Sequence, residues 1–149
     1  MQIRPARVDD TARVRRIVTD AYTAYIARIG REPAPMIVDY GALITGTDQV
    51  SVLVDESDTA VGVLVAVPRA DHLFIDNIAV AVPGRGYGRL LLDHAERQAR
   101  RAGLAQLRLY TNAAMTENLT LYPHLGFVEV DRRTEDGFDR VYFRKDLRP

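Results

Sequence analysis

The sequence contains no cysteine and no tryptophan, and it carries no net charge at pH 7. The absence of cysteine excludes disulfides, thiolate metal ligands and a cysteinyl intermediate. The balanced charge gives no overall attraction to nucleic acid or to acidic membranes, so we expect neither as a partner. The longest aliphatic run, VGVLVAV, has seven residues, whereas a membrane span needs about 20. The sequence starts with the charged segment MQIRPARVDD, which does not resemble a signal peptide. We therefore expect a cytoplasmic protein.

Nucleophiles and metal ligands are also scarce. The only serines are Ser51 and Ser57, and neither lies in a nucleophile elbow. The histidines His72, His94 and His124 lack the paired spacing of a metal site. We therefore expect neither a covalent acyl-enzyme nor a bound metal.

What the sequence does contain is the pattern of one mixed α/β domain over residues 1–149. Apolar residues make up 47% and charged residues 27%, which is typical of a globular fold with a core. The apolar periodicity predicts helices near 10–30, 36–46, 87–102 and 116–126. It predicts strands at 3–6, 49–56, 59–68, 72–80, 105–111, 127–134 and 140–147, with the nearly apolar strand 72–80 in the centre of the sheet. This order indicates an α/β fold with a mixed sheet rather than repeated βαβ units.

A glycine-rich turn, PGRGYG, lies between strand 72–80 and helix 87–102. Free N–H groups at a helix start form a site for an anion, and Arg85 and Arg89 add positive charge. A P-loop is excluded because no Gly-Lys-Ser/Thr follows, and a dinucleotide fingerprint is excluded because Arg89 replaces its third glycine. A turn without a ligand is the alternative interpretation.

A second cluster lies in NLTLYPHLGF. Asn118 and Tyr122 are four residues apart and share one helix face. With a reference pKa of about 10, a tyrosine keeps a proton at neutral pH that it can donate to a thiolate leaving group. The alternative is that Tyr122 packs in the core and Asn118 is a surface amide.

Together, IAVAVPGRGYGRLLL and NLTLYPHLGF resemble the motifs of the GNAT superfamily of acetyl-CoA-dependent N-acetyltransferases, although Pro83 stands where the family usually has Gln or Arg. The resemblance implies a splayed mixed sheet of about seven strands flanked by about four helices. It implies that strands 72–80 and 105–111 part near their ends and admit the pantetheine arm of acetyl-CoA. Tyr122 matches the family's usual general acid. The residues that the resemblance assigns to acetyl-CoA are Ala79, Val80 and Val82 through their backbone, Arg85, Gly86, Tyr87, Gly88, Arg89 and Leu90 around the pyrophosphate, and Asn118.

The chemistry also needs a group that accepts the proton of the attacking amine. Asp76 is our candidate because it interrupts an apolar strand, although a structural carboxylate is an equal alternative. Strict alternation predicts that Asn77 points to the opposite face. The resemblance places the acceptor site around the first two helices, which makes Tyr22, Tyr25, Asp39, Glu32 and Asn77 candidates to bind the amine. For the first four, a solvated loop or helix surface is the alternative.

These observations predict direct acetyl transfer to a primary amine in a ternary complex. The loop RIGREPAPM favours a small-molecule acceptor. The alternatives are a protein N-terminus or lysine as acceptor, and a non-catalytic acyl-CoA-binding module. The segment RVYFRKDL is a candidate sheet edge for a homodimer.

Overall fold

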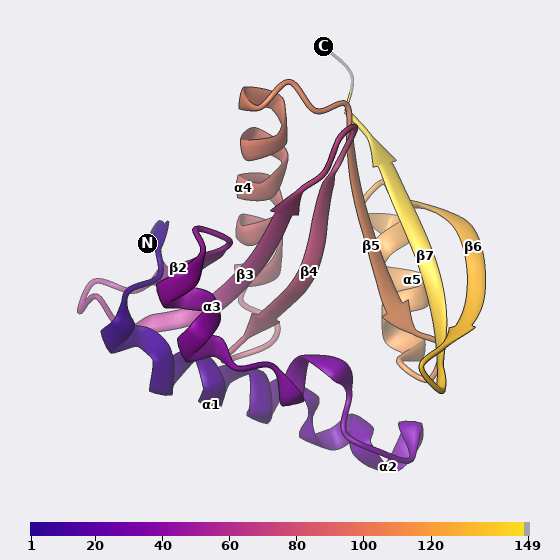
Figure 1. The fold of residues 1–149 in the computed structure, drawn as a ribbon, viewed down its shortest axis with the longest axis horizontal. Helices are drawn as coiled ribbons and strands as arrows, with labels where there is room; N and C mark the ends of the chain where they lie inside the picture. Colours follow the sequence, from indigo (N-terminus) through magenta and orange to yellow (C-terminus); the bar gives the residue numbers. More distant parts are fainter. Residues whose placement is uncertain (148–149) are drawn as a thin grey trace.

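A computed structural model describes residues 1–147 of the chain (Figure 1). The other two residues of the predicted domain 1–149, residues 148–149, lie outside the described residues. The helices are α1 (Thr11–Tyr22), α2 (Ile26–Ile29), α3 (Tyr40–Gly46), α4 (Tyr87–Arg101) and α5 (Thr116–His124). The strands are β1 (Gln2–Pro5), β2 (Val50–Val54), β3 (Ala60–Pro68), β4 (Leu73–Val80), β5 (Gln106–Asn112), β6 (Val128–Glu135) and β7 (Phe138–Asp146).

The seven strands form one sheet in the order β1-β2-β3-β4-β5-β7-β6. Only β4 and β5 pair in parallel, and the other neighbours are antiparallel. The predicted mixed fold with a central strand at 72–80 is therefore confirmed. The terminal hairpin does lie at an edge of the sheet, but the edge strand is β6 and not RVYFRKDL, because β7 pairs with β5 on one side and β6 on the other.

Helices cover both faces of the sheet. On one face, α4 and α5 pack on a core that includes Leu64, Leu91 and Phe143. On the other face, α1 and α3 pack on a core that includes Ile17 and Val63. The sheet is thus a buried middle layer, as expected for strands with apolar residues on both sides.

The first predicted helix is shorter than its apolar pattern suggests. The α-helical part ends at Tyr22, a short 3-10 turn covers Thr23–Tyr25, and α2 then runs only to Ile29. Tyrosine and threonine are weak helix formers. Gly30, with φ of 90°, ends α2. The segment after α1 therefore leaves the face of the sheet and turns across the molecule toward the β6–β7 hairpin (Figure 1).

The two central strands separate along their length. Strands β4 and β5 pair only at Leu73↔Leu107, Phe74↔Arg108 and Ile75↔Leu109. Beyond this point β4 stays paired with β3, and β5 stays paired with β7. Figure 1 shows the result as a V that opens downward in the view, with α1 and α2 across its open end.

Candidate active site

A β-bulge lies at the point where the V begins. Val65 pairs with Asn77 and the next residue of β3, Ala66, pairs with Ile75, which leaves Asp76 as the extra residue of β4. A bulge bends its strand and changes the direction of the following side chains. Before the bulge, Ile75 packs in the core beneath α4, whereas Ala79 packs in the core beneath α1. After the bulge, the odd-numbered residues of β4 therefore point to the face that its even-numbered residues occupied before it.

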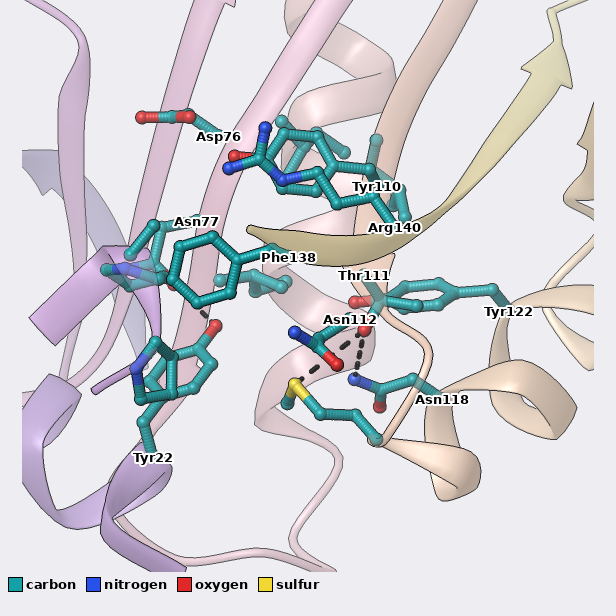
Figure 2. Close-up of a pocket in the computed structure, with 17 residues that line it drawn as sticks. Tyr22, Asp76, Asn77, Tyr110, Thr111, Asn112, Asn118, Tyr122, Phe138 and Arg140 are labelled. Atoms are coloured by element: carbon teal, nitrogen blue, oxygen red, sulfur yellow. Dashed lines mark hydrogen bonds between the residues drawn. The ribbon is translucent and has the colours of Figure 1, made fainter. Parts of the chain in front are cut away.

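This reversal corrects the prediction that Asp76 and Asn77 face opposite sides of the sheet. Both residues line the same open cleft, which holds about 610 Å³ of empty space between the two arms of the V (Figure 2). The cleft is lined by Tyr22, Pro33, Ala34, Pro35, Ile75, Asp76, Asn77, Ile78, Leu109, Tyr110, Thr111, Asn112, Met115, Asn118, Tyr122, Phe138 and Arg140.

Tyr122 enters the cleft from α5 (Figure 2). Its ring is buried and packs against Phe127 and Phe143, with ring centroids 5.6 and 5.7 Å away. Its hydroxyl has no hydrogen-bond partner among residues 1–147. Burial raises the pKa of Tyr122 to about 12. The hydroxyl therefore stays protonated at neutral pH and is free to donate to a bound group.

Asn118 lies one helical turn before Tyr122 and also faces the cleft. Its Nδ2 donates to Thr111 Oγ1 at 3.0 Å, and the Thr111 hydroxyl contacts Met115 Sδ at 3.8 Å. These contacts connect α5 to the free arm of β5. They hold the Asn118 side chain in place and leave its carbonyl oxygen without a hydrogen bond in the described residues.

Asp76 is the acidic side chain that lines the cleft. It has no hydrogen bond or ion pair within the part of the chain that the structure describes. Partial burial raises its pKa, and the nearby positive charges of Arg69 and Arg140 oppose this rise. A carboxylate with a raised pKa is a better proton acceptor than an ordinary aspartate.

Asn77 and Tyr22 belong to one hydrogen-bond chain. The Tyr22 hydroxyl donates to Asn77 Oδ1 at 2.8 Å, and Asn77 Nδ2 donates to the Tyr40 hydroxyl at 3.0 Å. Tyr40 in turn donates to the carbonyl of Pro35 at 2.6 Å. Burial raises the pKa of Tyr22 and of Tyr40, so both remain neutral donors. The chain fixes the Pro33–Pro35 loop against β4 and so shapes the cleft wall.

The other predicted acceptor residues lie outside the cleft. The Asp39 carboxylate accepts from the Ala42 N–H at 3.1 Å and caps α3. Tyr25 donates to Glu117 Oε2 at 2.7 Å, and Arg28 pairs with Glu117 Oε1 at 2.6 Å. Glu32 is exposed and does not line the cleft. The Tyr25 and Arg28 contacts connect the segment after α1 to α5 across the open end of the V.

The glycine-rich turn follows β4 and leads into α4. Gly84 and Gly86 have φ of 79° and 76°, a conformation that favours glycine. Gly88 has no such requirement, and a Cβ added there would meet no atom within 4 Å. The first N–H groups of α4 have no partner in the helix itself. Arg85 and Arg89 are exposed beside them, and neither has an ion-pair partner in residues 1–147.

The structure also reveals site residues that the sequence reasoning missed. Tyr110, Thr111, Phe138 and Arg140 line the cleft from β5 and β7. The parallel pairing of β4 with β5 would have identified Tyr110 and Thr111 as neighbours of the diverging end of β4. Arg140 had no comparable signal, because its place depends on how the β6–β7 hairpin pairs with β5.

The described residues contain neither a metal-binding group nor a membrane-spanning helix. No group of three histidine, cysteine, aspartate or glutamate side chains in residues 1–147 is arranged to hold a metal ion. None of the helices described here is long and apolar enough to cross a membrane.

Comparison with known proteins identifies the class to which this fold and cleft belong. The model of the acetyltransferase (GNAT) family matches residues 11–127, which is more than half of the chain, so the chain belongs to the GNAT family of acetyltransferases. As a member of this family it is an N-acetyltransferase that uses acetyl-CoA as cosubstrate. The resemblance seen in the glycine-rich and NLTLYPHLGF motifs is therefore confirmed. No curated protein matches the sequence.

Solved structures share the fold. The PaiA N-acetyltransferase from Thermoplasma acidophilum, in complex with coenzyme A, has a TM-score of 0.78 at 16% identity, covering 98% of both chains. The ribosomal-protein-alanine N-acetyltransferase from Brucella melitensis has a TM-score of 0.73 at 24% identity, covering 99% of this chain and 100% of the other. Nourseothricin acetyltransferase has a TM-score of 0.61 at 23% identity, covering 66% of this chain and 65% of the other.

Proposed function

We propose that this acetyltransferase moves the acetyl group of acetyl-CoA directly to the primary amine of a small molecule, with Tyr122 as general acid and Asp76 as general base. The observation that carries the proposal is the Tyr122 hydroxyl, which faces the opening of the V without a hydrogen-bond partner in the described chain. Asp76, also unpaired, lines the same cleft from β4. The cytoplasmic location stays a prediction from the sequence.

The edge of β4 supports a site for the pantetheine arm. Beyond Ile75 this edge has no strand partner on the β5 side in the described residues. The Ala81 N–H donates to Val61 O on the β3 side at 2.8 Å. Because N–H groups alternate between the two edges of a strand, the Val80 N–H faces the open edge, where it would polarise the thioester carbonyl. Val80 and Val82 are thus our candidates for backbone pairing with the arm, whereas the same alternation turns the backbone groups of Ala79 toward β3.

The turn from Gly84 to Leu90 supports a site for the pyrophosphate. Its glycines leave space for close approach, and the free N–H groups of the first turn of α4 point outward at the positive end of the helix dipole. Arg85 and Arg89 add charge-assisted hydrogen bonds. Asn118 is our candidate for a further contact with the arm.

The chemistry divides between the two walls of the cleft. Acetyl-CoA supplies the acetyl group as a reactive thioester. Asp76 accepts the proton that the amine loses as the C–N bond forms, directly or through a water molecule. Tyr122 donates its proton to the CoA sulfur as the C–S bond breaks, which yields the free thiol. With no cysteine in the chain, direct transfer is the simplest route.

The segment after α1 favours a small acceptor. Its contacts with Glu117, together with the Arg31 guanidinium 3.6 Å from the centre of the Phe138 ring, extend across the open end of the V. Such a covering limits the space for an extended polypeptide. The related enzymes differ in the acceptors that their names give, so these names do not decide between a small molecule and a protein.

The test is a measurement of thiol release from acetyl-CoA with a panel of small amines, proteins and peptides, with the acetylated product identified by mass. We expect turnover with small amines and a rise in melting temperature with acetyl-CoA. Stabilisation without thiol release from any acceptor would favour a binding module. Turnover only with peptides or proteins would favour the protein acceptor.

A further inference from the structure

The cleft contains one arginine whose charge is largely buried but whose hydrogen-bonding groups are free. The Arg140 side chain on β7 is 13% exposed and lines the cleft beside Tyr110 (Figure 2). Its nearest carboxylate oxygens, on Glu135 and Asp136, are 3.6 and 4.0 Å away. Both distances exceed a hydrogen bond. Among residues 1–147, Arg140 donates no hydrogen bond at all.

Aromatic rings, rather than hydrogen bonds, hold the guanidinium. It lies 4.4 Å from the centre of the Tyr110 ring and 5.6 Å from the centre of the Phe138 ring. Such contacts fix the orientation of the guanidinium while leaving its N–H groups open. Every fully buried polar side-chain atom in the described part of the chain has a hydrogen-bond partner. The N–H groups of Arg140 therefore remain accessible from the cleft.

Because these N–H groups are accessible and no described side chain accepts a hydrogen bond from them, they are available to an anionic group bound in the cleft. The fork of N–H donors matches a carboxylate, which binds it through two parallel hydrogen bonds. Glu135 and Asp136 offset part of the charge but do not occupy the donors. Arg140 and Phe138 lie outside residues 11–127, the stretch matched by the family model.

We infer that the acceptor is a small amino acid, that is, a molecule with a primary amine and a carboxylate, and that Arg140 binds the carboxylate. The inference rests on the proposed function, because it assigns the acceptor of the same cleft. Asp76 supplies a negative charge for the amine and Arg140 a positive charge for the carboxylate. The two groups are near enough for their charges to interact, yet they form no ion pair with each other. A small zwitterion would pair its ammonium group with Asp76 and its carboxylate with Arg140.

The first arm of the test uses the wild-type enzyme with matched acceptors. These are α-, β- and ω-amino acids with uncharged side chains, the carboxamide and decarboxylated amine of each, and tripeptides that begin with the same residue. We expect kcat/KM for the best amino acid to exceed that for its carboxamide and its decarboxylated amine by about 10- to 100-fold. Equal rates for the acid and the carboxamide, or a preference for the tripeptide, would overturn the inference.

The second arm changes Arg140. Arg140→Gln is expected to reduce kcat/KM for the preferred amino acid by about 10- to 100-fold, mainly through KM, and to leave the carboxamide nearly unchanged. Arg140→Lys should restore only part of the loss, because lysine lacks the planar fork. Arg144→Gln, on the same strand but outside the cleft, is the matched control. An equal loss for acid and carboxamide would contradict a role in carboxylate binding.

The proposed function and the amino-acid acceptor can fail separately. If no amine in the panel releases thiol, the proposed function fails and the inference fails with it. If amines are acetylated without regard to a carboxylate, only the inference fails. If Arg140→Gln does not fold, the matched acceptors on the wild-type enzyme still decide the question.

Discussion

Arg4 and Arg140 have similar exposure but opposite surroundings. The Arg4 side chain is 9% exposed and that of Arg140 is 13% exposed. Arg4, on β1, donates two hydrogen bonds to the Asp10 carboxylate, at 2.8 and 3.2 Å, and a third to Asp58 at 3.0 Å. Arg140, on β7, donates none within residues 1–147. Around Arg4 the chain itself supplies the hydrogen-bond acceptors, and we call this region the Arg4 corner. In the cleft, the donors of Arg140 have no acceptor in the described chain and are available to a bound ligand.

The same contrast holds for the other polar groups of the two regions. Asp10 accepts from Arg4 and also from the Arg7 N–H at 2.7 Å. In the cleft, the hydroxyl of the buried Tyr122 has no partner in the described chain, and the exposed Asp76 carboxylate has none either. Folded proteins normally satisfy their buried polar groups. We therefore expect changes at Arg4 and Asp10 to reduce stability, and changes in the cleft to reduce activity with little effect on stability.

Tyr122→Phe should give the largest effect on activity. The substitution keeps the ring that packs against Phe127 and Phe143 and removes only the free hydroxyl. We expect kcat to fall by roughly 10²- to 10⁴-fold, the usual contribution of a general acid. Steady-state thiol release and thermal unfolding, each on the variant and the wild type, are the measurements.

The control for this prediction is Tyr142→Phe, which removes a hydroxyl from β7 outside the cleft. It should retain turnover. If Tyr122→Phe also retained turnover, Tyr122 would be a packing residue and the proton donor would lie elsewhere. A loss of acetyl-CoA binding as large as the loss of kcat would likewise argue against an acid role.

Asp10→Ala should give the largest loss of stability. It leaves the buried Arg4 guanidinium with the half-exposed Asp58 carboxylate and the neutral Pro5 carbonyl as partners. Removing one partner of a buried ion pair costs about 3 kcal/mol in the free energy of unfolding. Urea unfolding at pH 7 measures this loss, and kcat at 25 °C should be unchanged. A stability loss below about 0.5 kcal/mol would show that the Arg4 corner contributes no more than a surface pair.

The pH dependence gives a second test of Asp10. The hydrogen bond from Arg4 lowers the pKa of Asp10 in the folded protein. Stability from such a carboxylate is present above the unfolded pKa, near 3.9, and is lost as pH falls through the lower folded value. The stability difference between wild type and Asp10→Ala should therefore shrink below about pH 4. A difference that stays constant from pH 7 to pH 3 would contradict this origin.

Asp76→Asn tests the other wall of the cleft. As a general base, Asp76 must be ionised, so activity rises as pH rises through its pKa, which burial places above that of an ordinary aspartate. We expect the variant to lose this acid-side limb of the kcat/KM profile and roughly 10²-fold in rate. The rise in rate at higher pH that comes from deprotonation of the amine itself should remain. Asp48→Asn, at an exposed loop position, is the control.

The same two regions show what could be predicted from the sequence. Strand and helix periodicity gave the order of the elements, and the two motifs gave Tyr122, Asn118 and the glycine-rich turn. The bulge at Asp76 was not predictable from LFIDNIAV, because it is defined by the pairing of Val65 and Ala66 in another strand. Consequently, strict alternation put Asn77 on the wrong face.

Arg140 and the acceptor-side contacts were beyond sequence reasoning for a similar reason. The strand RVYFRKDL has one face toward the cleft and one toward α5, and only its register against β5, with Asn112 opposite Arg140, selects the face. Tyr25 and Asp39 do not line the cleft, because helix α1 ends early and Asp39 caps the next helix. Long-range pairing and local capping are decided by the folded chain.

Gly88→Ala should give the smallest effect, and it separates binding from stability at the glycine-rich turn. A Cβ at Gly88 meets no atom within 4 Å, and its φ is not in the left-handed region. Alanine in a helix is favoured over glycine by about 0.5–1 kcal/mol, so the variant should be slightly more stable. Its methyl group should nevertheless weaken acetyl-CoA binding, by about tenfold, if the backbone approaches the pyrophosphate closely.

Gly86→Ala, where φ is 76°, should instead lose stability. Calorimetric titration with acetyl-CoA and thermal unfolding distinguish the two variants, and unchanged affinity in Gly88→Ala would remove this turn from the binding site.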